Sequence, residues 1–209
     1  MRAKLMLLVL LGLGSAVPAL ADTYSLTADH CTGGCGTAPF GTIDVTQDGA
    51  NTVLVDVSLN SAAFVSTGFP GSFAFDLLGN HTISVSNLTS GWSLLSASAG
   101  SLQFDGFGNL DYALECVVCG KGGSNPFAGP ISFDVTALGL TPASFLDLST
   151  GNSQVYFVAD IMGSTGNTGP VGATLESGGT SVPEPATLGL LSLGFVGTLL
   201  ARRRRVTVV

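Results

Sequence analysis

Short runs of alternating apolar and polar residues recur through the middle of the chain. In the clearest run, residues 52–59, valine or leucine fills every second position, and Thr, Asp and Ser stand at most of the positions between. Successive strand side chains point to opposite faces, so this pattern predicts strands with one buried and one exposed face. Similar runs, separated by turn residues, occupy 42–46, 72–77, 82–88, 92–96, 102–104, 110–116, 131–135, 154–161 and 171–175. The sequence therefore predicts an all-β fold, an antiparallel two-sheet β-sandwich of about ten strands.

One short segment has helical character instead. Residues 141–146 begin with Thr141 as an N-cap candidate and Pro142 in the first turn, which predicts a short helical connector. Residues 163–182 are rich in Gly, Ser and Thr and have no periodicity. We therefore expect a β-sandwich domain over 22–162, followed by a last strand fragment and a linker over 163–182.

The first residues have the pattern of a secretory signal peptide. Arg2 and Lys4 give a basic start, residues 5–13 are apolar, and Ala19-Leu20-Ala21 is an A-x-A cleavage site. The sequence therefore predicts a signal peptide over 1–21 and a mature chain that begins at Asp22. An uncleaved membrane anchor is the alternative, but the apolar run is short for a membrane span.

The last stretch of the chain has three parts, over residues 183–209. Two prolines in Pro183-Glu184-Pro185 restrict the backbone and prevent a helix there. Residues 186–201 are apolar or small and uncharged, and would form a transmembrane helix of roughly 24 Å, short of the ~30 Å bilayer core. Basic residues at the end of a span favour the cytoplasmic side, which places the rest of the chain outside. The basic block comprises Arg202, Arg203, Arg204 and Arg205.

This proline, apolar and arginine arrangement resembles the PEP-CTERM sorting tail of exported proteins in Gram-negative bacteria that make exopolysaccharide. The resemblance implies recognition by the membrane enzyme exosortase and cleavage near Pro183-Glu184-Pro185. It also implies export through the inner membrane, brief anchoring there, and a final place at the cell surface or outside the cell. A permanent single-span anchor is the alternative. The runs 104–108, 119–125 and 157–161 are similar to secreted β-rich domains found before such tails, which implies no known activity.

The charge of the central region is strongly one-sided. Lys121 is the only Lys or Arg between residues 22 and 182, whereas all but one of the 14 Asp and Glu lie there. Such a surface repels phosphates, so a nucleic-acid partner is excluded, whereas divalent cations are attracted. Most of these acids alternate with apolar residues, the pattern of a solvated sheet face; the examples are Asp44, Asp56, Asp134 and Asp160.

Four cysteines occur as two close pairs in glycine-rich loops, Cys31 with Cys35 and Cys116 with Cys119. Export to an oxidising compartment favours two disulfides. Pairing between the two loops would constrain the unfolded chain more than two local rings. A four-thiolate zinc site and a redox-active Cys116-x2-Cys119 are the alternatives.

The best candidate for a ligand site is the loop that contains Asp105, Asn109 and Asp111. Oxygen ligands in a flexible glycine loop suit Ca²⁺, although the distal Glu of an EF-hand is missing. A simple glycine turn is the alternative. No other cofactor is expected.

The sequence contains no hydrolase, metalloprotease or phosphate-binding signature, and neither His30 nor His81 belongs to one. We therefore expect no enzymatic activity, and predict a structural or adhesive protein of the extracellular matrix or biofilm, with exosortase and exopolysaccharide as partners. A carbohydrate-binding module, with or without Ca²⁺, is one alternative; it would expose aromatic rings in a groove, for which Trp92, Tyr112 and Tyr156 are the candidates unless they lie in the core. A secreted hydrolase with two facing carboxylates is the other.

Overall fold

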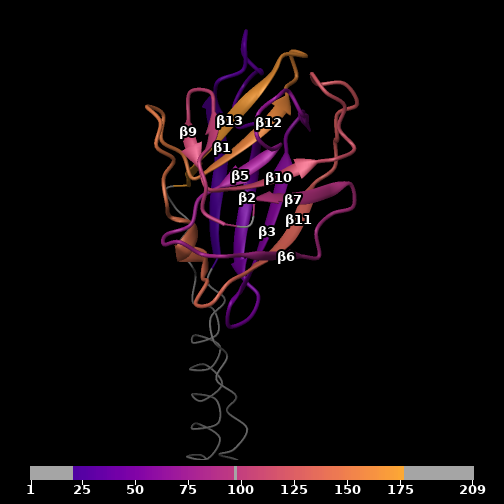
Figure 1. The fold of residues 1–209 in the computed structure, drawn as a ribbon. Helices are drawn as coiled ribbons and strands as arrows, with labels where there is room; N and C mark the ends of the chain where they lie inside the picture. The colour runs from indigo at the N-terminus through magenta and orange to yellow at the C-terminus, as the bar shows by residue number, and fades with distance from the viewer. Residues whose placement is uncertain (1–20, 97, 177–209) are drawn as a thin grey trace, which may run out of the picture. The chain divides into compact units, whose positions relative to one another are not determined.

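The computed structural model describes residues 21–96 and 98–176, and these residues form an all-β, antiparallel domain (Figure 1). Thirteen strands and one 3-10 helix follow in chain order. They are β1 (Ala21–Asp29), β2 (Gly41–Gln47), β3 (Thr52–Leu59), β4 (Ala63–Phe64), β5 (Phe73–Phe75), β6 (Ser84–Ser86), β7 (Trp92–Ser96), β8 (Leu102–Phe104), β9 (Gly108–Leu110), β10 (Tyr112–Cys116), β11 (Ile131–Thr136), η2 (Pro142–Phe145), β12 (Phe157–Met162) and β13 (Thr168–Leu175).

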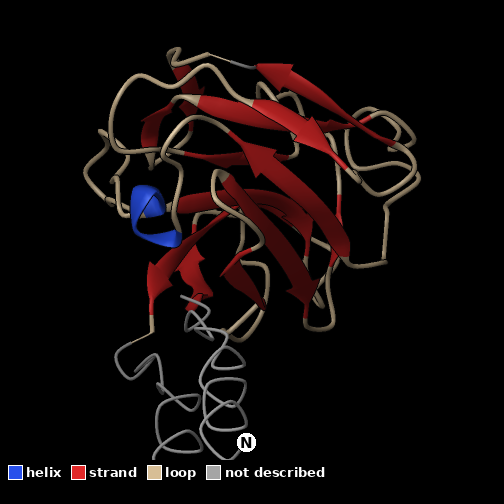
Figure 2. Cartoon of the chain, turned by 90° about the horizontal axis from the view of Figure 1, so that it is seen from below, coloured by secondary structure: helices blue, strands red, loops and turns tan. Residues whose placement is uncertain are grey.

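Eleven of these strands belong to one continuous sheet. Its order is β6-β11-β3-β2-β1-β13-β12-β5-β10-β7, and β4 pairs with β12 outside this path. The sheet curls over on itself, as the view in Figure 2 shows. An isolated bridge between Thr82, just before β6, and Ser98, just after β7, brings the two ends of the strand order together. The sheet is therefore nearly closed.

This architecture corrects the expectation of two separate sheets. The two halves do pack face to face, as in a sandwich, but β1 and β13 hydrogen-bond to each other and join them along one side. The sequence pattern did not predict a strand at 21–29, and it assigned only 171–175 of β13 to a strand fragment before a linker. The domain consequently extends at least to Leu175, and β13 is a central strand rather than an appendage.

Phenylalanines fill the space between the two halves of the sheet. Phe73 and Phe75 of β5 lie 6.0 and 6.2 Å from Phe133 of β11, measured between ring centroids, although β5 and β11 belong to opposite halves. Phe75 also contacts Tyr112, Phe145 and Phe157 at 5.5 to 6.4 Å. Strand alternation places these rings on the inner face, where they are fully buried.

A second apolar cluster lies on the outer face of β5, β10 and β12. Ala74, Ala113 and Val158 point outward there and are covered by Phe104, Phe107 and Leu110 of the separate β8–β9 hairpin. The hairpin approaches the loop before β12 so closely that a Cβ on Gly108 would lie 2.2 Å from the backbone nitrogen of Gly151. Only glycine fits there, particularly because Gly108 has a φ of +82°.

The predicted signal peptide and the predicted helix over 186–201 lie outside the described residues. Within 21–96 and 98–176, no helix is long and apolar enough to cross a membrane. The predicted helical connector is confirmed as η2, with Pro142 in its first turn.

Truncating Phe75 tests the central aromatic cluster. We expect Phe75→Ala to lower the free energy of unfolding by about 3 to 5 kcal/mol, because the ring is fully buried against five other aromatic residues. Leu138→Ala is the matched control, since Leu138 is 88% exposed and should change stability by less than about 0.5 kcal/mol. Urea denaturation of both variants measures the difference, and equal losses would contradict this account of the core.

Candidate functional site

A polar hollow of about 230 Å³ lies on the outer side of the sheet, beside the turn of the β8–β9 hairpin. Four separate segments meet there: the loop after β1, the loop after β4, the hairpin turn and the start of β13. The lining residues are His30, Thr32, Thr67, Phe69, Asp105, Thr168, Gly169 and Pro170. The hollow lies where β1 ends and β13 begins. The described chain begins at the other end of β1 and ends just after the other end of β13.

His30 is held in place by β13 and by the β8–β9 hairpin. Its backbone N–H donates a hydrogen bond to the carbonyl oxygen of Pro170 at 3.1 Å. Its imidazole contacts Phe107 edge to face, with 4.6 Å between ring centroids. A Cβ on Gly106 would lie 2.0 Å from His30 Nδ1, so the ring also packs directly on the glycine backbone. These contacts fix one wall of the hollow.

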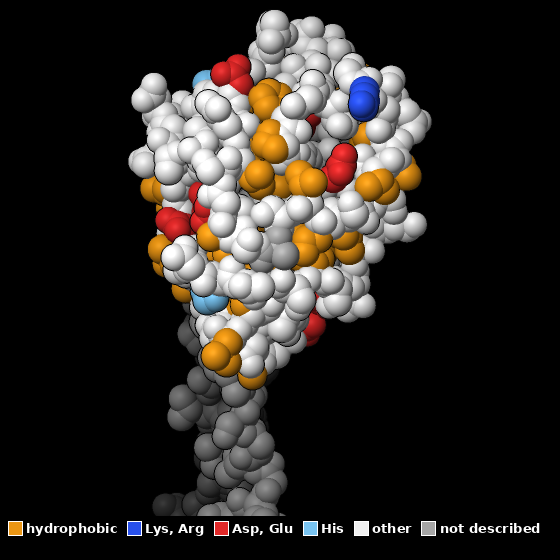
Figure 3. Space-filling view, in the orientation of Figure 1, with side chains coloured by type: hydrophobic (Ala, Val, Ile, Leu, Met, Phe, Trp, Pro, Cys, Tyr) orange, Lys and Arg blue, Asp and Glu red, His pale blue; other side chains and the backbone are white. Residues whose placement is uncertain are grey.

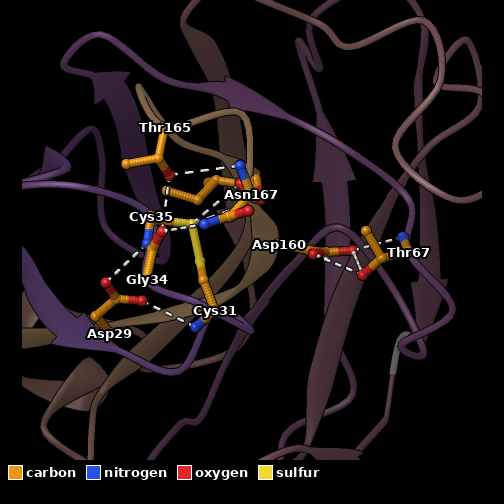
Figure 4. The surroundings of a disulfide bond; sticks show 9 residues. Asp29, Cys31, Gly34, Cys35, Thr67, Asp160, Thr165 and Asn167 are labelled. Atoms are coloured by element: carbon orange, nitrogen blue, oxygen red, sulfur yellow. Dashed lines mark hydrogen bonds between the residues drawn. A yellow bond between two sulfur atoms is a disulfide. The ribbon is translucent and has the colours of Figure 1, made fainter.

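Thr67 is held by a buried carboxylate behind it (Figure 4). The backbone N–H of Thr67 donates to Asp160 Oδ2 at 2.7 Å, and its hydroxyl lies 2.9 and 2.7 Å from the two carboxylate oxygens. Burial raises the pKa of Asp160 to about 6, and the hydrogen bonds from Thr67 partly oppose that rise. The carboxylate oxygens of Asp160 accept the hydrogen bonds from both the backbone N–H and the hydroxyl of Thr67.

The loop after β1 is fixed by a disulfide and by side-chain hydrogen bonds, as Figure 4 shows. Cys31 and Cys35 are bonded to each other, and their backbone N–H groups donate to the carboxylate of Asp29 at 2.8 and 2.9 Å. The amide of Asn167 donates to the carbonyl oxygen of Gly34 at 2.9 Å. The rim of the hollow next to this loop is consequently rigid.

The cysteine prediction is supported: both pairs form local disulfides, Cys31 with Cys35 and Cys116 with Cys119. No bond joins the two loops, so the more constraining arrangement does not occur. Asp29, Cys31 and Cys35 do cluster tightly, but both sulfur atoms belong to the disulfide and supply no thiolate to a metal.

The three predicted calcium ligands do not gather around one point. Asp105 lies exposed in the turn of the β8–β9 hairpin and lines the hollow. Asn109 is within β9, and Asp111 follows the far end of that strand, where its backbone N–H donates to the carboxylate of Asp76. Asp105 and Asp111 therefore lie at opposite ends of the β8–β9 hairpin, with the length of β9 between them.

Asp76 and Asp111 form an acidic group with Asp147 instead. Asp76 is 5% exposed, and burial raises its pKa to about 7, with further contributions from the charges of Asp111 and Asp147. Burial and Asp147 also raise the pKa of Asp111. The sequence pattern does not reveal this group, because Asp76 occupies an ordinary polar position in an alternating run.

The prediction of solvated sheet acids is right for two residues and wrong for two. Asp44 and Asp56 are exposed, whereas Asp134 is 6% and Asp160 0% exposed. Asn87 covers Asp134 and donates a hydrogen bond to it, and the loop containing Thr67 covers Asp160. Alternation identifies the outer face of a strand, but not the loops that fold over that face.

The candidate aromatic residues for sugar stacking lie mainly in the core. Trp92 is 7% exposed and Tyr112 is fully buried, while Tyr156 packs edge to face on Tyr24 with 5.4 Å between centroids. At the hollow the aromatic residue is Phe69, which is only partly buried and stacks on Phe104 at 5.7 Å.

Few charges surround this site. Lys121 is the only Lys or Arg among residues 21–96 and 98–176, and its segment forms a bridge with Ser66, next to Thr67. The face drawn in Figure 3 is mostly uncharged, with scattered acidic side chains and a single basic one. Asp105 is the one carboxylate in the lining, so the hollow itself does not present two facing acids.

Comparison with known proteins identifies the tail and not the domain. A family model described as the PEP-CTERM protein-sorting motif matches residues 181–205. No curated protein and no solved structure matches the chain significantly. The chain thus carries a PEP-CTERM sorting motif, as its Pro183-Glu184-Pro185 and arginine block predicted, and this supports an exported protein that exosortase processes at the membrane.

The raised pKa of Asp76 predicts a specific pH dependence of stability. The carboxyl group of Asp76 binds its proton more tightly in the folded than in the unfolded protein. Its contribution to the free energy of unfolding is therefore fully present below pH 4 and is lost as pH rises through about 7. Asp76→Asn keeps an oxygen that accepts from Asp111 but cannot ionise. We expect it to flatten the pH dependence and to raise stability at pH 8 by up to roughly 4 kcal/mol.

Urea denaturation between pH 4 and 8 measures this effect. Asp56→Asn, which alters an exposed acid on β3, is the matched control. Its free energy of unfolding should change with pH as in the wild type. If the free energy of unfolding of Asp76→Asn changed with pH as in the wild type, Asp76 would not be the cause of the pH dependence.

Proposed function

We propose that this chain is a structural or adhesive protein of the extracellular matrix, delivered by exosortase-dependent sorting and associated with exopolysaccharide. The sorting motif at 181–205 carries the proposal. The position of β13 supports it, because this strand, the last in the described part of the chain, ends at Leu175, and residues 176–182 separate it from Pro183 in the sequence. Cleavage near Pro183-Glu184-Pro185 would release a domain with its core complete.

The character of the domain fits a matrix role better than a catalytic one. Its hollow contains one carboxylate and one imidazole rather than a pair of facing acids. Both cysteine pairs are disulfides, which suits an oxidising environment outside the cell. We accordingly propose that the domain has no enzymatic activity.

Carbohydrate binding is the second candidate function, and the polar hollow favours it. A rigid concave site with a few fixed polar groups and one aromatic ring is typical of small-ligand recognition. This function is compatible with adhesion, because a matrix protein can hold polysaccharide through such a site. Calcium dependence remains part of this second proposal, with Asp105 as the one predicted ligand that lines the hollow.

Binding to the producing organism's own exopolysaccharide tests the proposal. We expect residues 22–182, purified with both disulfides formed, to cosediment with the polymer in a saturable manner. The absence of saturable cosedimentation would contradict the adhesive role. The assay is run with Ca²⁺ and with a chelator: loss of binding on chelation would support a calcium-dependent lectin, and unchanged binding would remove calcium from the account.

A further inference from the structure

We propose that the hollow between His30, Thr67, Asp105 and Thr168 binds a single neutral sugar unit of a polysaccharide. The inference rests on the proposed function and specifies its binding site and ligand class. The lining combines one carboxylate, one imidazole, three threonine hydroxyls and the ring of Phe69. Together these provide several hydrogen-bonding groups beside an apolar surface, which matches the hydroxyls and the C–H face of a sugar ring.

The hydrogen bond between Thr67 and Asp160 determines the polarity of the hollow. Because the Thr67 hydroxyl donates its only hydrogen to the buried carboxylate, its oxygen can only accept a hydrogen bond from a ligand. The carboxylate oxygens of Asp105 are likewise hydrogen-bond acceptors. The hollow is thus rich in acceptors and selects a ligand that donates hydrogen bonds through hydroxyl groups.

The same acceptors disfavour acidic sugars. A uronate or a phosphate brings acceptor atoms and negative charge, which would face Asp105 and the Asp160 carboxylate behind Thr67. No Lys or Arg lines the hollow to compensate for that charge, although Lys121 lies on a neighbouring segment. We therefore assign a neutral sugar.

The size and rigidity of the hollow limit the ligand to about one ring. Its volume of about 230 Å³ is below the 300–1,000 Å³ typical of pockets for drug-sized ligands. The lining is already fixed by the Cys31–Cys35 disulfide, by Asp160 behind Thr67 and by Phe107 against His30. Binding consequently costs little side-chain ordering.

The location of the hollow suits recognition of an external polymer. It lies where β1 ends and β13 begins, and these strands extend 9 and 8 residues from there to the ends of the described chain. At about 3.3 Å per residue, that distance is roughly 25 Å. The hollow therefore lies about one strand length from Leu175, where β13 ends.

Amide chemical-shift mapping tests the assignment. The domain 22–182, which has its own complete core, is titrated with methyl glucoside, methyl galactoside and, as the acidic comparison, glucuronate. We expect at least one neutral glycoside to shift the amides of His30, Thr67, Gly106 and Thr168 in a saturable way. We also expect glucuronate to bind at least tenfold more weakly. Neutral glycosides that leave these amides unchanged, or tighter binding of glucuronate, would overturn the proposal.

Two substitutions test whether the hollow is the part of the domain that binds the polymer. Asp105→Ala removes an exposed acceptor, and Thr168→Val removes a hydroxyl while keeping the side-chain shape. Each should weaken exopolysaccharide cosedimentation at least tenfold with the same urea midpoint, whereas Asp56→Ala on β3 should have no effect. Full binding by both hollow variants would overturn the site while leaving the matrix role intact. Failure of the wild-type domain to bind any polymer would instead overturn the proposed function.

Discussion

The pairing of β1 with β13 is the constraint on which the rest of the fold depends. These strands come from the two ends of the domain, yet they are neighbours in the middle of the strand order. The other strands of one half are joined to the sheet through β1, and those of the other half through β13. The two halves can therefore cover the phenylalanine core only when this long-range pair has formed. Contacts of this sequence separation are entropically costly to form, and β13 is therefore essential to the whole domain.

The same pairing organises the outer surface of the domain. It places the start of the described chain and the end of β13 together at one end, since Tyr24 is opposite Leu175. At the other end, the loop after β1 and the start of β13 form two walls of the hollow. The hollow and the end of β13 are therefore separated by about the length of one strand.

Much of the fold was predictable from alternation, because that pattern reports local geometry. Strands β3, β7 and β8 have the predicted ends. Export to an oxidising compartment predicted two disulfides, but the sequence left their pairing open. Pairing was not predictable: β1 overlaps the predicted cleavage site, and β13 contains Gly169, Pro170 and Gly172, which resemble a linker. The hollow was missed for the same reason, since only the folded chain brings His30, Thr67 and Asp105 together.

The central claim is that the sorting tail is separable from a domain that is complete before it. The most direct test is the intact mass of the protein recovered from a producing strain with exosortase, with an exosortase-deficient strain as control. The account predicts that residues after the Pro183-Glu184-Pro185 region are absent from the mature protein of the first strain and retained in the second. Mature protein that retains residues 186–209 in the presence of exosortase would contradict it.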